Sequence, residues 1–96
     1  MELRHLRCFL AVAEELHFAR AAERLHIEQS PLSRTIKELE EELDAQLFVR
    51  TTRSTRLTRA GELFLEHVPR VFASLQQARD SVKAAVNGFH GQLRIA

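Results

Sequence analysis

The sequence has no tryptophan, no tyrosine and one cysteine, Cys8, among its 96 residues. A single cysteine excludes an internal disulfide and fits a reducing compartment, and the apolar neighbours of Cys8 predict a buried structural thiol. Three glycines and two prolines leave little room for long flexible loops. No apolar run approaches the ~20 residues of a membrane span, and the first residues lack the apolar core of a signal peptide. These absences predict a small cytoplasmic domain with no membrane partner.

Charge is balanced in total but not along the chain. The 14 lysines and arginines and the 13 acidic residues give a net charge of +1, which by itself does not indicate a nucleic-acid ligand. Five acidic residues and no basic one lie between Glu38 and Asp44, whereas four arginines and no acidic residue lie between Val49 and Ala60. The two charged segments cancel in the sum but occupy different places in the molecule.

Two helices are predicted at the start of the chain, because apolar residues recur there at helical spacing. The first helix, near residues 2–16, depends on Leu3, Leu6, Leu10 and Ala13. The second is short and depends on Phe18, Ala21, Ala22 and Leu25. Its alanines allow another helix to approach closely, and residues 26–28 form a brief turn after it.

A third helix follows that turn. Ser30 and Pro31 have the form of a helix start, with a capping hydroxyl before a proline at the first helical position. Asp44 is expected to end the helix, since aspartate tolerates the left-handed conformation better than most residues. Its buried stripe is predicted to consist of Leu32, Ile36, Leu39 and Leu43.

Residues 47–58 have the pattern of a small hairpin. Leu47–Val49 is short and apolar, Thr51–Ser54 is a polar tip, and Thr55–Thr58 alternates like a second strand. Thr58 also suits the N-cap of a following helix.

That fourth helix is expected over residues 59–87 and to end at Asn87-Gly88. Its apolar residues step by four and three over about three heptads, a stripe longer than a small domain can cover. We therefore expect a homodimer, with a bend at Pro69. Residues 93–96 resemble the start of a further strand. The predicted dimer contacts are Phe64, Val68, Val71, Phe72, Leu75, Ala78 and Val82.

Together these elements predict a mainly α fold: a winged helix-turn-helix of three helices and a two-stranded hairpin, followed by a long dimerisation helix. The second helix of such a pair fits the major groove of double-stranded DNA, where base edges carry a distinct donor and acceptor pattern. Arg53 at the hairpin tip suits the minor groove, and Arg50 and Arg56 suit phosphates. The predicted DNA-facing residues of the third helix are Gln29, Ser30, Ser33, Arg34 and Lys37.

Other classes of function have weaker support. The five histidines, His5, His17, His26, His67 and His90, show no metal-ligand spacing, and we expect no metal or cofactor site. No phosphate-binding glycine loop or nucleophile–base pair indicates an enzyme. An alternative is a protein-interaction module, in which the winged helix is a scaffold and the heptad helix recruits a partner.

Several segments resemble the N-terminal region of LysR-type transcriptional regulators. The resemblance covers the whole chain and is carried by Ala21–Leu25, Gln29–Arg34, Leu39–Leu43, Leu47–Arg50 and Leu57–Gly61. It implies a bacterial regulator that contacts DNA through Gln29, Ser30, Pro31, Ser33 and Arg34 and, from the wing, Arg53. It also implies an antiparallel pairing of linker helices, an inverted-repeat operator, and higher oligomers of the full-length protein.

The resemblance divides the chain into a DNA-binding domain (1–58), a linker helix (59–87) and the start of a hinge (88–96). The hinge would lead to a C-terminal domain that binds a small-molecule effector. Five positions depart from the family pattern: His17, Glu28, Ser30, Asp44 and Pro69. The family would start the third helix at Glu28, where the capping signal alone places the start at Ser30. His17 stands where a capping hydroxyl is common.

Overall fold

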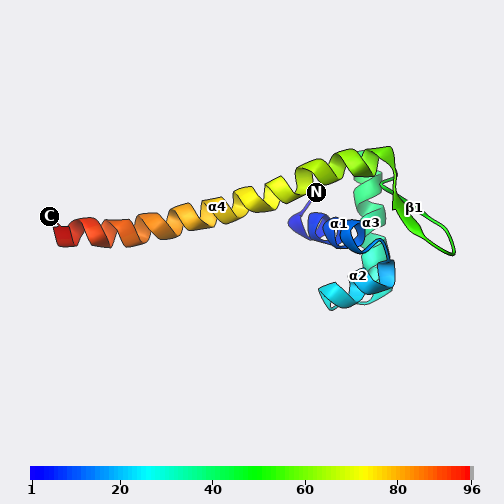
Figure 1. The fold of residues 1–96 in the computed structure, drawn as a ribbon, viewed down its shortest axis with the longest axis horizontal. Coiled ribbons are helices and arrows are strands. Elements are labelled where there is room, and N and C mark those ends of the chain that lie inside the picture. Colours follow the sequence, from blue (N-terminus) through cyan, green and yellow to red (C-terminus); the bar gives the residue numbers. More distant parts are fainter. Residues whose placement is uncertain (96) are drawn as a thin grey trace.

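The computed structural model describes the backbone of residues 1–95 and the side chains of residues 1–88. The three shorter helices and the hairpin gather into a small domain, from which the long fourth helix extends to one side (Figure 1). The molecule measures 65 × 26 × 19 Å. The elements in chain order are α1 (Leu3–Glu15), α2 (Phe18–Leu25), α3 (Gln29–Leu43), β1 (Phe48–Arg50), β2 (Thr55–Leu57) and α4 (Arg59–Ile95).

Each of the first three helices ends at a residue in the left-handed conformation. These residues are Leu16, His26 and Asp44, with φ of 51°, 59° and 52°. Their backbone N–H groups turn back to carbonyls of the last helical turn, so the chain reverses sharply without a long loop. The end predicted at Asp44 is confirmed, and the short connections hold α1, α2 and α3 close together.

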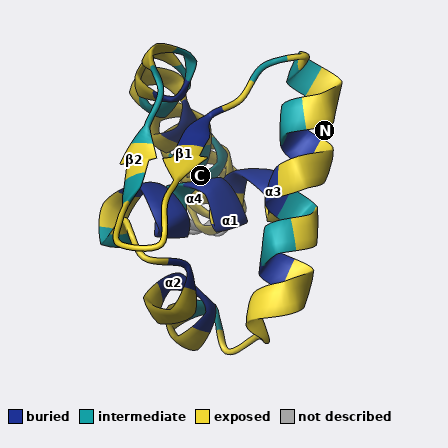
Figure 2. Cartoon of the chain, turned by 90° about the vertical axis from the view of Figure 1, so that its right-hand side faces the viewer, coloured by how far each residue is buried: buried dark blue, intermediate teal, exposed yellow. Residues whose placement is uncertain are grey.

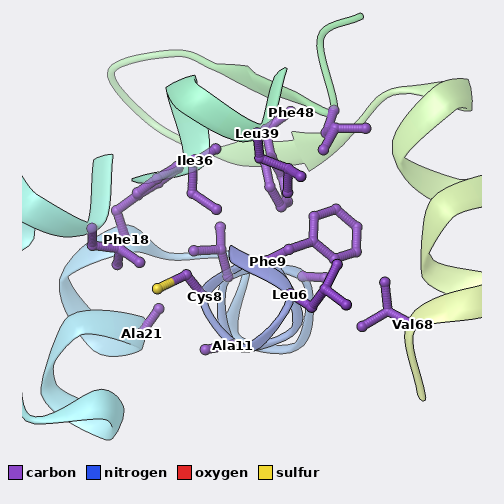
Figure 3. Close-up of a cluster of buried hydrophobic side chains, with 14 of the residues drawn as sticks. Leu6, Cys8, Phe9, Ala11, Phe18, Ala21, Ile36, Leu39, Phe48 and Val68 are labelled. Carbon is purple, nitrogen blue, oxygen red and sulfur yellow. The ribbon is translucent and has the colours of Figure 1, made fainter. Parts of the chain in front are cut away.

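The core forms where α1 is surrounded by the other elements. Phe9 of α1 is fully buried, and its ring lies 5.3 Å from that of Phe48 and 4.9 Å from that of Phe64, centroid to centroid. Figure 3 shows buried apolar side chains, Phe9 and Phe48 among them, converging on α1, with Val68 of α4 on one side. Leu32, which is also fully buried, brings α3 into the same cluster. Aromatic burial of this kind supplies much of the stability of a small domain.

The start of α3 differs from the one that its capping signal predicts. Glu28 is the N-cap residue, with extended backbone and no side-chain capping bond, and the helix begins at Gln29. The start at Ser30 is therefore wrong, and Pro31 is the third helical residue rather than the first. Proline is tolerated there because no residue of the first turn has an intrahelical acceptor for its N–H.

The hairpin packs its base against the rest of the domain. β1 and β2 are antiparallel, with Phe48 opposite Leu57 and Arg50 opposite Thr55. The Glu40 carboxylate of α3 accepts hydrogen bonds from the backbone N–H groups of Leu47, at 2.7 Å, and Phe48, at 3.3 Å. This carboxylate therefore fixes the first residues of the wing to α3.

α4 begins as predicted and ends later than predicted. The Thr58 hydroxyl accepts a hydrogen bond from the Gly61 N–H at 3.0 Å, which confirms the N-cap. The end at Asn87-Gly88 is wrong, because the helix continues to Ile95 and Gly88 does not adopt the positive φ of a helix-terminating glycine.

The later end of α4 also removes the predicted strand, since residues 93–95 are helical, and Ala96 lies outside the described residues. The helix is continuous across Pro69. No helix in the described part of the chain is both long and apolar enough to cross a membrane.

Candidate nucleic-acid interface

α3 has one buried face and one face open to solvent. Leu32, Ile36 and Leu39 are buried in the core, as their spacing predicts, whereas Leu43 of the same predicted stripe is only half-buried against it. The opposite face contains the residues that the sequence assigns to DNA. Five of them are exposed and one, Ser33, is half-buried; the exposed five are Gln29, Ser30, Pro31, Arg34 and Lys37. The structure thus brings these side chains together over the first turns of one helix.

The first turn of α3 also offers free backbone donors. N–H groups at a helix start have no intrahelical acceptor, and Glu28 does not cap them with its side chain. The helix dipole adds a partial positive charge at this end. Gln29 and Ser30 therefore combine polar side chains with backbone N–H groups suited to an anion.

The wing tip is organised by its own hydrogen bonds. The Thr51 N–H donates to the Ser54 carbonyl at 2.8 Å, and the Thr51 hydroxyl accepts from the backbone N–H groups of Arg53 and Ser54 at 3.3 and 3.0 Å. The side chain of Arg53 is exposed at the tip, and that of Arg56 is exposed on β2. The tip thus presents a guanidinium from an ordered loop.

Arg50 lies between the wing and the two helices of the helix-turn-helix. Its guanidinium carbon is 3.8 Å from the centroid of the Phe18 ring, a cation–π arrangement, and Nη1 donates to the Ser33 hydroxyl at 3.3 Å. The sequence alone predicts only a phosphate contact for Arg50. It misses both contacts, which join residues far apart in the chain and leave no local signal.

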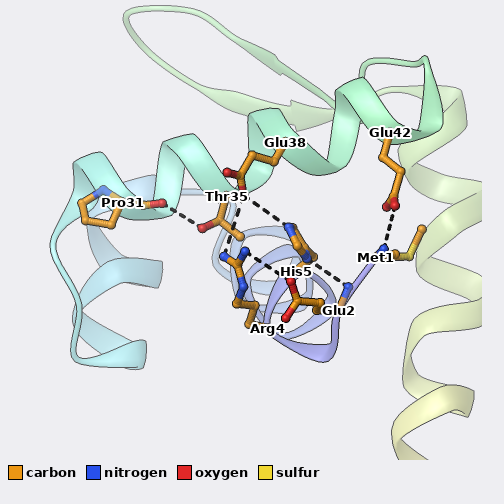
Figure 4. Close-up of polar contacts among 8 residues, drawn as sticks. All are labelled: Met1, Glu2, Arg4, His5, Pro31, Thr35, Glu38 and Glu42. Carbon is orange, nitrogen blue, oxygen red and sulfur yellow. Dashed lines mark hydrogen bonds and ion pairs between the residues drawn. The ribbon is translucent and has the colours of Figure 1, made fainter.

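The acidic residues in the C-terminal half of α3 contact the N-terminal segment. The Glu38 carboxylate lies 3.3 Å from Nε2 of the buried His5 on α1, and the Glu42 carboxylate pairs with the amino terminus at 2.6 Å. The same carboxylate of Glu38 lies 3.7 Å from Arg4 (Figure 4). The sequence predicts only that these acids face away from phosphate, whereas their contacts show that they fasten the far half of α3 to the N-terminal segment.

Two histidines that the sequence does not assign to DNA have structural roles. His5 is buried, and its Nδ1 accepts the Glu2 N–H at 3.1 Å, so that Nε2 carries the proton that faces Glu38. His17 caps α2, because its Nδ1 accepts the Arg20 N–H at 3.1 Å. Among the residues with described side chains, no group of three His, Cys, Asp or Glu is arranged to hold a metal ion.

Cys8 is free and buried in the core, as predicted. Burial raises the pKa of its thiol, and the nearby Arg4 and Arg7 lower it by a smaller amount. The thiol is therefore kept neutral and shielded from reagents.

The proposed DNA-facing side is hollowed between its elements. A cleft of about 300 Å³ is lined by His17 at the start of α2, Gln29 at the start of α3, and wing residues from Arg50 to Thr55. Figure 2 shows the wing and the exposed face of α3 on the side of the domain from which α4 points away. This side therefore combines a polar helix start, an arginine-bearing hairpin and the cleft between them.

The stripe of α4 passes from covered to exposed along the helix. Val68 is buried and Phe64 and Phe72 are partly buried against the core. Beyond them the domain gives no cover: Val82 is 65% exposed and Val86 is 53% exposed. The small domain therefore covers only the beginning of the stripe.

Comparison with known proteins decides the family. The model of the family described as "Bacterial regulatory helix-turn-helix protein, lysR family" matches residues 3–62. The chain belongs to this family. Over 95 residues it is 53% identical to the transcriptional regulator ShiR of Corynebacterium glutamicum, an alignment that covers 99% of this chain and 32% of ShiR. This LysR-family chain thus spans about a third of the length of the curated relatives it matches.

Solved structures confirm the winged helix-turn-helix with a long helix. The DNA-binding domain of BenM, in a complex with benA site 1 DNA, has a TM-score of 0.87 and 43% identity, covering 92% of this chain and 99% of that one. The DNA-binding domain of CbnR, also in a DNA complex, has a TM-score of 0.86 and 41% identity, covering 90% and 99%. The resemblance and the fold class inferred from the sequence are both confirmed.

Proposed function

We propose that this chain is the DNA-binding portion of a bacterial LysR-type transcriptional regulator and binds a specific double-stranded sequence. The observation that carries the proposal is the placement of the exposed α3 face and the arginine-bearing wing on one side of the domain. It is supported by the similarity to the BenM and CbnR domains, whose structures are DNA complexes. This role is not enzymatic and places the protein with the DNA in the cytoplasm.

The start of α3 enters the major groove in this proposal. Arg34 is suited to the acceptor edge of guanine and Gln29 to adenine, because each side chain can form two parallel hydrogen bonds with that base. Ser30, Pro31, Ser33 and Lys37 flank them and hold the helix against the backbone. The N–H groups of the first turn receive a phosphate.

The wing enters the adjacent minor groove. Arg53 inserts at the tip, since a narrow minor groove has an enhanced negative potential, and Arg56 holds a phosphate beside it. The chain between residues 1 and 58 thereby forms the complete DNA-binding unit.

α4 pairs the chain with a second copy. The stripe beyond the domain is apolar and exposed, and such a surface is uncommon on a monomer. Two-fold pairing of the helices presents two copies of α3 to the same duplex, which requires an inverted-repeat operator. The pairing also explains the exposed stripe without a foreign partner. In a full-length protein like its relatives, α4 leads toward a domain that binds a small-molecule effector, and the full-length protein forms higher oligomers.

Binding to selected and random duplexes at several salt concentrations tests the proposal. The affinity for both should fall along a straight line in log–log coordinates, with a slope of about −0.9 for each phosphate neutralised. The selected duplex, enriched from a random pool, should bind at least ~10³-fold more tightly than random DNA. Binding that is independent of salt, or equal on both duplexes, would overturn the proposal.

A further inference from the structure

Arg50 is one side chain that contacts two helices from the wing. It is the last residue of β1, its guanidinium stacks on Phe18 of α2, and it donates a hydrogen bond to Ser33 of α3. The Phe18 ring is itself fixed, because it is buried and packs edge-on against Phe48 at 6.0 Å between centroids. Arg50 therefore stacks on a ring that is buried and packed in the core.

Arg50 is also the outermost point at which the wing is fastened to the helices. Nearer the base of the wing, the Glu40 carboxylate accepts hydrogen bonds from the backbone N–H groups of Leu47 and Phe48. Beyond Arg50, the described hydrogen bonds of residues 51–54 all lie within the tip. The tip is thus a loop bonded within itself, and its nearest contact with the helices is made by Arg50, the residue that precedes it.

That position matters for DNA. If α3 lies in the major groove and the wing lies in the minor groove, the sugar-phosphate backbone that separates the grooves crosses the cleft between them. Arg50 lines this cleft together with Gln29 and Arg53. The separation of Gln29 and Arg53 across the cleft must match the spacing of the two grooves.

We propose that Arg50 is a positioning residue, which sets the distance between the wing and α3 and so makes the minor-groove contact of Arg53 possible. The inference rests on the proposed function and changes the role that the sequence predicts for Arg50. Arginine suits the task because its guanidinium is planar and can stack on a ring while it donates in its own plane. Lysine carries the same charge, but its ammonium group is not planar and lacks the fixed pair of N–H donors of a guanidinium.

A double-mutant cycle on the 96-residue chain tests this role. Arg50→Lys keeps the charge, Arg53→Ala removes the minor-groove contact, and the third variant carries both changes. Affinity for the selected duplex is measured by fluorescence anisotropy at one salt concentration. We expect Arg50→Lys to weaken binding roughly fivefold, and to have no further effect when Arg53 is already alanine. Arg59→Lys, an exposed arginine paired with Glu62 at the start of α4, is the matched control and should bind like the wild type.

A spacing readout separates positioning from a general loss of structure. Duplexes are made in which the A·T-rich flank is moved by one base pair relative to the half-site. The wild type should discriminate between the original and moved flanks, and Arg50→Lys should discriminate less. Phe18→Leu, which removes the ring and no charge, should behave like Arg50→Lys if circular dichroism shows that it is folded. If it is not folded, the double-mutant cycle of Arg50 and Arg53 alone decides whether Arg50 has the positioning role.

The outcomes are distinct. Arg50→Lys binding with the affinity of the wild type would overturn the positioning role. A double variant whose loss of affinity equals the product of the two single losses would also overturn it. Either result fits an arginine that contacts phosphate independently of Arg53. If the wild type itself shows neither salt dependence nor sequence preference, the proposed function fails instead.

Discussion

Arg34 lies in the second turn of α3 on the exposed face, with no contact to the core. We expect Arg34→Ala to weaken specific binding by about 1–3 kcal/mol, the range for one bidentate base contact, while leaving stability unchanged. Competition between selected and random duplexes measures this, with Arg79→Ala on exposed α4 as the control for lost charge. An equal loss on both duplexes would mean that Arg34 contacts only phosphate.

Gly61 stands where α4 passes close to the base of the wing. A Cβ there would lie 2.2 Å from the Leu47 carbonyl oxygen and 2.8 Å from the Leu57 side chain. The overpacking costs about 1–3 kcal/mol, which exceeds the gain of up to about 1 kcal/mol that alanine brings to a helix. We therefore expect Gly61→Ala to lower the free energy of unfolding.

Urea unfolding of Gly61→Ala checks this, and Gly88→Ala is the matched control. Nothing lies within 4 Å of a Cβ at Gly88, so that variant should be neutral or more stable. A Gly61→Ala protein as stable as the wild type would show that the start of α4 moves away from Leu47 at no cost.

At the scale of one element, α2 depends on an unusual cap. His17 replaces the capping hydroxyl common in the family and accepts the Arg20 N–H in its place. His17→Ala should cost about 0.5–2 kcal/mol of stability, whereas His17→Ser, which restores a hydroxyl acceptor, should stay close to the wild type. Thermal unfolding of the three proteins distinguishes them. Equal stability of the alanine and serine variants would contradict the prediction that the His17 cap stabilises α2.

The wing is the second element with a separable role. Because a narrow, A·T-rich minor groove attracts an inserted guanidinium, Arg53→Ala should weaken binding more on duplexes with A·T-rich flanks than on duplexes with G·C-rich flanks. Anisotropy titrations of the two duplex sets provide the measurement, with Arg53→Lys as a variant that keeps the charge. A uniform loss across flanks would place Arg53 on phosphate instead of in the groove.

At the scale of the whole molecule, the assembly depends on the part of α4 that the domain leaves uncovered. Leu75 lies at the centre of the stripe and is half-buried, between covered Val68 and exposed Val82. Leu75→Asp would place a charge in the apolar contact between the two α4 helices, at a cost of several kcal/mol, so the helices should separate. Sedimentation at micromolar concentration should show a dimeric wild type and a monomeric variant.

Gln77→Asp is the control for Leu75→Asp. Gln77 is exposed and lies two residues on, which turns it about 200° around the helix, away from the stripe. It should leave the dimer intact. A monomeric wild type, or a Leu75→Asp dimer as tight as the wild type, would contradict the proposal that two copies pair through the apolar stripe of α4.

The sequence by itself determined what depends on neighbours in the chain. Helical spacing predicted the buried stripe of α3, the Asp44 signal predicted its end, and Thr58 predicted the start of α4. The family motifs predicted the fold and the candidate interface. These features depend on periodicity, capping and left-handed conformations, which act within a few residues.

Two local sequence signals predicted helix boundaries that the structure does not have. The Ser30-Pro31 signal placed the start of α3 two residues late, because proline fits any position of a first turn. Gly88 predicted an end to α4, but a glycine in a helix costs only about 1 kcal/mol relative to alanine and does not by itself stop it. In both cases the residue permits the predicted boundary without requiring it.

Only the tertiary structure decided the contacts between distant segments. Glu40 holds the base of the wing, Glu38 and Glu42 hold the N-terminal segment, and Arg50 bridges Phe18 and Ser33. A charged residue in the sequence is compatible with solvent, phosphate or a partner, and packing selects among them. The acidic segment and Arg50 acquire their roles because the sharp reversals after α1, α2 and α3 bring these groups within hydrogen-bond distance.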